Sequence, residues 1–314
     1  MNDQAVLGNF RWLDYVSRES SDVSNISSLT IHYSRKQIKH MKLITLLSFL
    51  IITLTTQAAT VDSIQIFSNS MHRSVKTVII TPSSYKIEKN KKYPVIYLLH
   101  GAFGSYANWI SKVPHIQQLA DQHQVMIVCP DGGFTSWYFD SPIDSTYRFE
   151  TFVGTEVPKY IDANYRTIAD RKGRAITGLS MGGHGGLFLG FRHSDLYSAC
   201  GSMSGALHVS VITQNYGVEK RLGDTAVNRK YWHDWSVLNM LDNYPKDSSL
   251  AIIIDCGTED RVLSMNRPVH QKMLKLEIPH DYTERPGEHN WAYWDKAIDY
   301  QVLFFRKHFD KVLK

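Results

Sequence analysis

Gly178-Leu179-Ser180-Met181-Gly182 is the stretch that decides the fold, because it implies a nucleophile and a backbone geometry together. A G-x-S-x-G sequence is typical of a sharp turn from a strand into a helix, with the serine hydroxyl exposed above a sheet. The two glycines lack a Cβ, so strand and helix can approach closely around Ser180. Free N–H groups at the start of the helix favour a developing oxyanion. The pentapeptide is weak evidence alone, so its context decides.

The flanking sequence supports this turn. Residues 174–177 are predicted to end a strand, and residues 181–191 are glycine-rich and then apolar. So many glycines are unfavourable in an isolated helix. They suit a helix that packs tightly against a sheet.

Strands and helices are expected to alternate along most of the chain, which indicates an α/β protein with a doubly wound, mostly parallel sheet. Residues 61–67 and 75–81 are predicted to form an antiparallel hairpin at its N-terminal side. The other predicted strands cover residues 95–99, 125–129, 174–177, 198–203, 250–256 and 281–285. The predicted helices cover residues 116–124, 149–163, 181–191, 266–276 and 291–307.

Residues 206–247 interrupt this alternation, just before the strand at 250–256. The segment combines aromatic and polar residues with only short helical patterns: Tyr216, Tyr231, Trp232, Trp235 and Tyr244. It is either an insertion that overhangs the carboxyl edge of the sheet, where ligands bind in such folds, or a peripheral helical pair with its own small core.

A serine nucleophile needs a base, and the base needs an acid that orients it. In this type of fold the acid follows a late strand and the base precedes the last helix. Asp260 is the predicted acid, with Glu259 as the alternative, because both follow the strand at 250–256. His289 is the predicted base.

The oxyanion requires two N–H donors that are already in place. Met181, directly after the nucleophile, is the first expected donor. The second should come from the glycine-containing loop after residues 95–99, where Ala102 is favoured and Phe103 is the alternative. His100 is expected to anchor this loop rather than to act in catalysis.

The N-terminal region predicts a secretory leader. Residues 41–59 have a short basic start, an apolar run and small residues before a cleavage point after Ala59. Residues 1–40 then form an upstream extension, and residues 60–314 form one domain. The prediction is a secreted or periplasmic protein with no stable membrane span after cleavage. The alternative is a membrane-anchored protein with a cytoplasmic tail.

Composition excludes some function classes. The net charge is +5 and no dense cluster of Lys and Arg is present, so nucleic acid is not expected as a partner. The three cysteines cannot form a disulfide framework. The histidines show no metal-ligand spacing, and neither a metal nor a cofactor is expected.

With these residues in place, the chain resembles the esterase D and antigen 85-like branch of the α/β-hydrolases. It looks most similar to secreted feruloyl and acetyl esterases of carbohydrate esterase family 1. The matching pieces lie in order along the chain: 97–101, 130–133, 178–185, 256–260 and 286–291.

The resemblance implies an α/β-hydrolase fold and a serine esterase that works through an acyl-enzyme. Its expected substrates are feruloyl or acetyl esters of carbohydrate, with plant cell-wall polysaccharide as a partner. Phe103, Trp137 and Trp291 are candidate substrate-binding residues, although Trp137 can equally be a packing residue. The alternatives are a general short-chain esterase, a thioesterase similar to S-formylglutathione hydrolase, a peptidase of the same fold and a non-catalytic carbohydrate-binding protein.

Overall fold

The computed structural model describes residues 32–39, 58–212, 216–244 and 249–314. The chain divides into two units, Met1–Gln57 and Ala58–Lys314. In the first unit only residues 32–39 are described, and they form a helix with exposed side chains. The predicted leader at 41–59 lies outside the described residues except for its last two. None of the described helices is long and apolar enough to cross a membrane.

The described part of the second unit contains an eight-stranded sheet with helices between the strands. The strands are β1 (Thr60–Ser68), β2 (Arg73–Thr81), β3 (Val95–Leu99), β4 (Met126–Pro130), β5 (Arg174–Gly178), β6 (Ala199–Met203), β7 (Ala251–Gly257) and β8 (Asp281–Arg285). The main helices are α2 (Ser84–Ile87), α3 (Asn108–Lys112), α4 (Ile116–His123), α5 (Phe149–Thr151), α6 (Val157–Asn164), α7 (Met181–Arg192), α8 (Glu219–Leu222), α9 (Arg229–Asp234), α10 (Val237–Met240), α11 (Leu263–Lys275) and α12 (Trp291–Val312).

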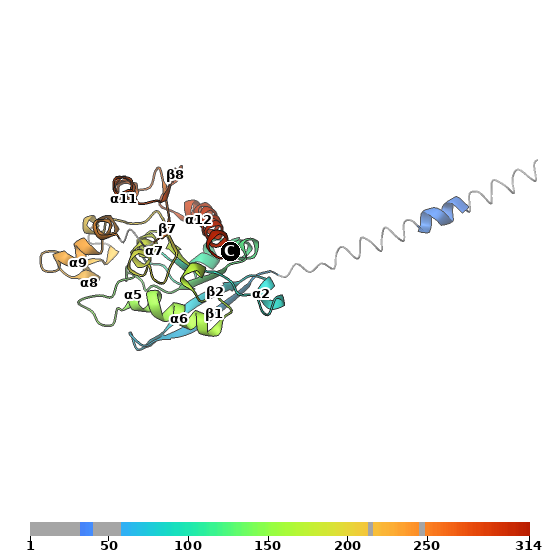
Figure 1. Cartoon of the computed structure of the whole chain (residues 1–314), viewed down its shortest axis with the longest axis horizontal. Helices are drawn as coiled ribbons and strands as arrows, with labels where there is room; N and C mark the ends of the chain where they lie inside the picture. The colour runs from blue at the N-terminus through green and yellow to red at the C-terminus, as the bar shows by residue number, and fades with distance from the viewer. Residues whose placement is uncertain (1–31, 40–57, 213–215, 245–248) are drawn as a thin grey trace, which may run out of the picture. The chain divides into compact units, whose positions relative to one another are not determined.

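The strand order is β1-β2-β4-β3-β5-β6-β7-β8. The β1–β2 and β2–β4 pairs are antiparallel, and every later pair is parallel. The α/β-hydrolase-type sheet and its N-terminal hairpin are therefore confirmed. The hairpin lies at one edge of the sheet and β8 at the other (Figure 1). The carboxyl ends of β3 to β8 point to one side, where ligands bind in parallel sheets.

Two apolar layers enclose the sheet. On one face, alternate residues of the central strands pack against α5, α6, α7 and α11. On the other face, the remaining residues pack against α3, α4 and α12. All five residues of β3 are buried, as a continuous apolar strand between two helical layers requires.

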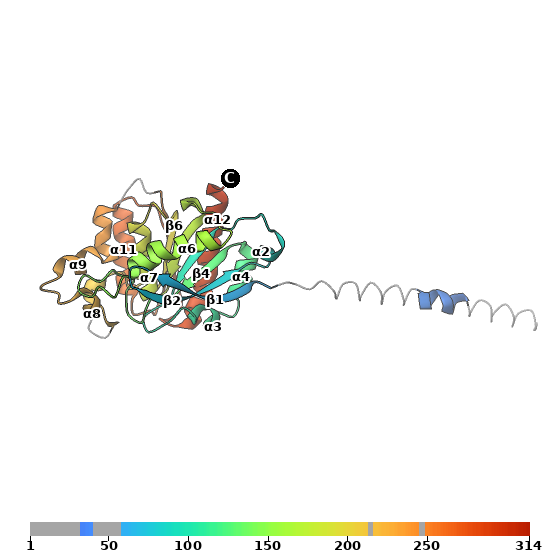
Figure 2. The ribbon, with the colours of Figure 1, turned by 90° about the horizontal axis from the view of Figure 1, so that it is seen from below.

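The described residues of the segment 206–247, which are 206–212 and 216–244, form short helices beyond the carboxyl edge of β6. Helices α8 and α9 lie at the end of the domain opposite α2 in both views (Figures 1 and 2). Trp232 and Val237 are buried in the main core, so this segment is continuous with the core of the domain.

Three of the predicted helices differ from the sequence-based expectation in helix type or by more than one residue at an end. The helix expected at 149–163 contains a π-helical turn at Phe152–Glu156, between α5 and α6. Helix α11 begins earlier than residue 266, because the Asp260 carboxylate accepts the Val262 N–H at 2.9 Å and starts the turn there. Helix α12 extends to Val312, because Phe309 continues its buried stripe.

Candidate active site

Ser180 occupies a strained turn between β5 and α7. Its φ of 55° and ψ of −114° lie outside the regions that residues with side chains prefer. A Cβ on Gly178 would come within 2.6 Å of the Gly182 carbonyl oxygen, and one on Gly182 within 2.6 Å of the His100 carbonyl oxygen. The close approach inferred from the two glycines is therefore present, and it holds the serine hydroxyl at the carboxyl edge of the sheet.

The structure brings Ser180, His289 and Asp260 into one hydrogen-bonded chain. The Nε2 atom of His289 lies 2.8 Å from the Ser180 hydroxyl. Its Nδ1 atom lies 2.9 Å from each carboxylate oxygen of Asp260. Asp260 follows β7, and His289 lies between β8 and α12. This arrangement leaves Nε2 free to accept a proton from the serine, since Nδ1–H donates to the carboxylate.

The two candidate acids have opposite surroundings. Asp260 is buried, and burial alone raises the pKa of its carboxyl group. The hydrogen bond and the charge of His289 act in the opposite direction and are among the effects that leave the pKa lowered overall. Glu259 is exposed and points to the next loop, where it accepts the Gly287 N–H, which lowers its pKa. Glu259 therefore braces the His289 loop and does not contact His289.

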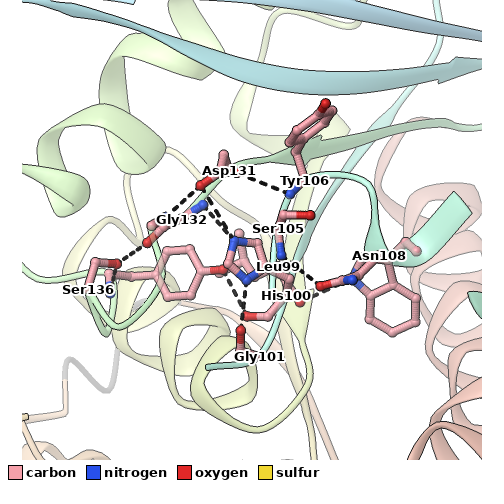
Figure 3. Close-up of polar contacts among 12 residues, drawn as sticks. Leu99, His100, Gly101, Ser105, Tyr106, Asn108, Asp131, Gly132 and Ser136 are labelled. Carbon is pink, nitrogen blue, oxygen red and sulfur yellow. Dashed lines mark hydrogen bonds and ion pairs between the residues drawn. The ribbon is translucent and has the colours of Figure 1, made fainter. Parts of the chain in front are cut away.

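His100 anchors the loop that follows β3 (Figure 3). Its Nδ1 atom lies 2.8 Å from the Gly101 carbonyl oxygen, and its Nε2 atom accepts the Gly132 N–H at 2.8 Å. The ring is buried, and burial lowers its pKa against the opposing effect of the Gly101 carbonyl. A neutral ring protonated on Nδ1 satisfies both contacts. The loop after β3 is thereby tied to the loop after β4.

Other polar contacts complete this support. The Tyr138 hydroxyl donates to the His100 carbonyl oxygen at 2.9 Å, and the Trp109 indole donates to the Leu99 carbonyl oxygen at 3.2 Å. The Asn108 side chain accepts the Ser105 N–H at 2.7 Å (Figure 3). The loop therefore has a fixed backbone before any ligand arrives.

The two expected oxyanion donors lie beside the serine. Within the described residues, neither the Ala102 N–H nor the Met181 N–H has a hydrogen-bond acceptor, and both residues line a cavity with Ser180. The Phe103 N–H donates instead to the Phe134 carbonyl oxygen at 2.7 Å. Phe103, the alternative donor, is therefore excluded from that role.

Two cavities meet at the serine. The apolar cavity, of about 340 Å³, is lined by Ala102, Trp137, Ser180, Met181, Ala206, Val211, Ile212, Tyr216, Arg261, Val262, Met265 and His289. The aromatic cavity, of about 260 Å³, is lined by Gly101, Ala102, Phe103, Gly104, Asn108, Leu179, Ser180, Tyr216, Arg261, His289, Trp291 and Trp294. Val211, Ile212 and Tyr216 belong to the segment 206–247, so part of that segment does overhang the serine.

The three predicted substrate-binding residues have different positions. Phe103 is half exposed and lines the aromatic cavity. Trp291 lines the same cavity and packs edge-on against Trp109. Trp137 lines the apolar cavity but is only 2% exposed, and its indole donates to the Tyr216 carbonyl oxygen at 2.9 Å. Trp137 is therefore a wall of the apolar cavity and not an exposed stacking platform.

Sequence reasoning missed three residues beside the reacting atoms, Trp294, Arg261 and Met265, and it named Tyr216 only as part of the segment 206–247. Trp294, and not Trp291, contacts the His289 ring, at 5.0 Å between ring centroids. Tyr216 and Arg261 line both cavities, and Met265 lines the apolar cavity. A usable signal existed for Trp294, which lies one helical turn after Trp291 and so on the same helix face. Among the described residues, no group of three His, Cys, Asp or Glu side chains could hold a metal ion.

Comparison with protein families gives one match over most of the chain. The family described as "Putative esterase" matches residues 68–305. The esterase Rv1288 of Mycobacterium tuberculosis is 27% identical over 236 residues, which cover 67% of this chain and 51% of that protein. The chain thus spans about half the length of that relative.

Two further matches cover nearly all of the related protein. The acetyl esterase of Caldicellulosiruptor saccharolyticus is 26% identical over 255 residues, covering 75% of this chain and 94% of that protein. A solved structure of a ferulic acid esterase is 30% identical with a TM-score of 0.71, covering 81% of this chain and all of that one.

Proposed function

This chain belongs to the esterase family that matches residues 68–305, and we propose that it is a carboxylic ester hydrolase in which Ser180 performs the reaction through an acyl-enzyme. The observation that carries this proposal is the chain of contacts from Ser180 through His289 to Asp260, with 2.8 and 2.9 Å between the heavy atoms. The strained backbone of Ser180 supports the same assignment.

The proposed reaction has two halves. The Ser180 oxygen attacks the ester carbonyl carbon while His289 Nε2 takes the hydroxyl proton. The carbon–oxygen bond of the ester then breaks, and His289 gives its proton to the leaving alcohol. In the second half, water attacks the acyl carbon while His289 takes its proton. The bond between the acyl carbon and the Ser180 oxygen then breaks, His289 returns the proton to Ser180, and the carboxylic acid leaves. Asp260 holds the imidazole tautomer and stabilises the imidazolium.

Ala102 and Met181 are the proposed donors to the oxyanion. Both N–H groups are held by packed backbone, and neither must give up another acceptor to reach the ligand. Loss of one such donor costs about 3 kcal/mol in the activation barrier of an acyl transfer. His100 contributes indirectly, because it fixes the loop that carries Ala102.

We assign the acyl group to the apolar cavity and the alcohol to the aromatic cavity. The apolar cavity of about 340 Å³ has apolar and aromatic walls, and mostly apolar clefts of this size bind small organic groups. The aromatic cavity offers Trp291 beside the Asn108 side chain, a combination that suits a sugar. Feruloyl or acetyl esters of carbohydrate are therefore the proposed substrates, and the similarity to an acetyl esterase and a ferulic acid esterase supports them.

Export is a second part of the proposal. It rests on the leader pattern at 41–59, with cleavage after Ala59. Plant cell-wall polysaccharide is then the proposed partner outside the cell. N-terminal sequencing of the protein exported by a bacterial host would test the cleavage point, and retention of an uncleaved leader would contradict it.

Hydrolysis of methyl ferulate and of p-nitrophenyl acetate, with the wild type and Ser180→Ala, tests the function. Wild-type turnover of both esters is expected, and Ser180→Ala should lower kcat on the order of a millionfold. Normal turnover by the variant would refute the mechanism. Cleavage of acetate alone would replace feruloyl esters by acetyl or other short acyl esters. Failure of Ser180 to react with a fluorophosphonate would favour the non-catalytic carbohydrate-binding alternative.

A further inference from the structure

Arg261 is a permanent cation at the junction of the two cavities. It is exposed and lines both the apolar and the aromatic cavity, next to Ser180 and His289. Within the described residues, no carboxylate forms an ion pair with it and no other group accepts its N–H donors. It is also the one Lys or Arg among the described residues that line these cavities.

The position of Arg261 is set by its neighbours in sequence. Asp260 and Val262 are buried, and the Val262 N–H is held by the Asp260 carboxylate. The backbone between them is therefore fixed, and the alternating burial leaves the Arg261 side chain outside the core. The Asp260 carboxylate is already occupied by His289, so Arg261 does not serve as its counter-ion.

An unpaired guanidinium beside a cleft is suited to a ligand carboxylate. Its planar donors match the two oxygens of a carboxylate, and a bond of this kind is stronger than one between neutral groups. A carboxylate on the acyl group would enter the apolar cavity, where Val211, Ile212 and Met265 offer it no side-chain hydrogen-bond donor. A carboxylate on the alcohol would occupy the aromatic cavity, which also holds the polar side chain of Asn108.

We infer that the enzyme prefers esters whose alcohol carries a carboxylate, and that Arg261 is the residue that contacts this carboxylate. A uronic acid within a polysaccharide and a small hydroxy acid share this chemistry. The inference rests on the proposed function, because it takes the alcohol to lie in the aromatic cavity. Arg261 is then a specificity residue of the site and takes no part in proton transfer.

The test compares charged and neutral esters of the same acid. 3- and 4-acetoxybenzoate carry the carboxylate on the leaving group, and their methyl esters are the neutral counterparts. For the wild type, the ratio of kcat/KM for the charged ester to that for the neutral ester should exceed the same ratio for Arg261→Gln by about tenfold. The preference for the charged ester should lie mainly in KM. Arg261→Lys should restore part of this preference, and added salt should reduce it in the wild type.

Arg229→Gln is the matched control, because Arg229 is an exposed arginine on α9 outside both cavities. Equal ratios for the wild type, Arg261→Gln and Arg229→Gln would overturn the inference and leave the proposed function standing. If none of the esters is hydrolysed, the proposed function itself fails.

A second pair locates the charge. p-Nitrophenyl hydrogen adipate carries its carboxylate on the acyl group, too far from the ester for rapid ring closure onto it, and p-nitrophenyl hexanoate is its neutral counterpart. An effect of Arg261→Gln confined to this pair would overturn the assignment to the alcohol. Acetylated oligosaccharides with and without a uronic acid distinguish the two sources of the carboxylate. A preference for the uronic acid that Arg261→Gln removes identifies the polysaccharide. If there is no such preference but the acetoxybenzoate test is positive, the source is a small hydroxy acid.

Discussion

At the scale of single residues, two adjacent acids divide the work of the His289 loop. Asp260 is buried against the imidazole, whereas Glu259 is exposed and accepts the Gly287 N–H two residues before His289. The Asp260 carboxylate therefore places a negative charge beside His289, and the Glu259 carboxylate holds the backbone of the loop that carries His289.

This division predicts different outcomes for two amide substitutions. Asp260→Asn should lower kcat by about 10⁴-fold, because an amide at this position favours the wrong imidazole tautomer and removes the charge that stabilises the imidazolium. Glu259→Gln keeps an acceptor for the Gly287 N–H, and its kcat should stay within about fivefold of the wild type. Steady-state kinetics on p-nitrophenyl acetate measures both. The reverse order of effects would make Glu259 the functional acid.

His184 is a second residue whose surroundings set its protonation. It lies on α7, fully buried, with Nε2 at 2.8 Å from the Trp235 carbonyl oxygen and its ring stacked on Phe188. Burial lowers its pKa to about 4. Below about pH 6.5 the unfolded chain binds a proton at this histidine that the folded chain excludes, so stability falls as the pH drops from about 6.5 to about 4.

His184→Gln should therefore make the free energy of unfolding less dependent on pH below about pH 6.5. Between pH 7 and pH 5 the free energy of unfolding of the wild type should fall by about 2 kcal/mol more than that of the variant. Urea unfolding at the two pH values measures this difference. His72→Asn, at an exposed position, is the control and should keep the wild-type pH dependence. An unchanged slope in His184→Gln would show that other groups control acid stability.

At the scale of elements, helix α7 contains glycines that lower its helix propensity but allow it to pack closely against the sheet. Its glycines place the helix backbone directly against the sheet, and a Cβ on Gly186 would lie 2.4 Å from the Gly201 carbonyl oxygen. Such contacts bring the start of the helix, and with it the Met181 N–H, close to the end of β5.

Gly186→Ala should consequently destabilise the protein by about 2 kcal/mol, although alanine is the better helix former by about 1 kcal/mol. Chemical denaturation gives the sign directly. Ser264→Ala, at an exposed position on α11, is the control and should be neutral or slightly stabilising. A stabilised Gly186→Ala protein would contradict the close contact between α7 and β6.

The elements were largely predictable from local pattern, whereas the cavity walls were not. The strand at 95–99 coincides with β3, because a buried apolar run carries its own signal. Trp137 and Tyr138 both have φ near 60°, and the Trp137 indole is bonded to Tyr216, 79 residues away. Neither the left-handed backbone nor the distant partner follows from the local sequence, so the sequence left open whether Trp137 contacts substrate or only packs.

The grouping of Ser180, His289 and Asp260 could be predicted from residue types at the ends of strands, since the fold fixes which loops meet. Its fine geometry depends on tertiary contacts, as Trp294 illustrates: its ring packs against His289, although only Trp291 was singled out from the sequence. Arg261 escaped notice because a single exposed arginine has no sequence signature. The role inferred for Arg261 depends on the two cavities that it lines.

At the scale of the whole molecule, the sheet and both apolar layers are built within Ala58–Lys314. The hairpin of β1 and β2 begins the sheet at Thr60, and the Ala59 N–H donates to the Asp121 carboxylate at 2.8 Å. A chain that starts at Ala58 should therefore unfold within about 2 °C of the full chain and keep its kcat. Differential scanning calorimetry and esterase kinetics on both chains test this. A large drop in either would make the preceding residues part of the folded enzyme.

The position of β8 has a further consequence for how reactivity arises. This strand is the outer strand of the sheet, it pairs only with β7 among the described strands, and His289 follows it directly. The base is separated from its serine by 109 residues of chain and by two intervening strands. During synthesis the nucleophile is therefore made long before its proton acceptor exists. On the proposed mechanism, the chain is inactive until β8 and α12 dock, and fraying of that edge would return it to the inactive state while most of the sheet is still intact.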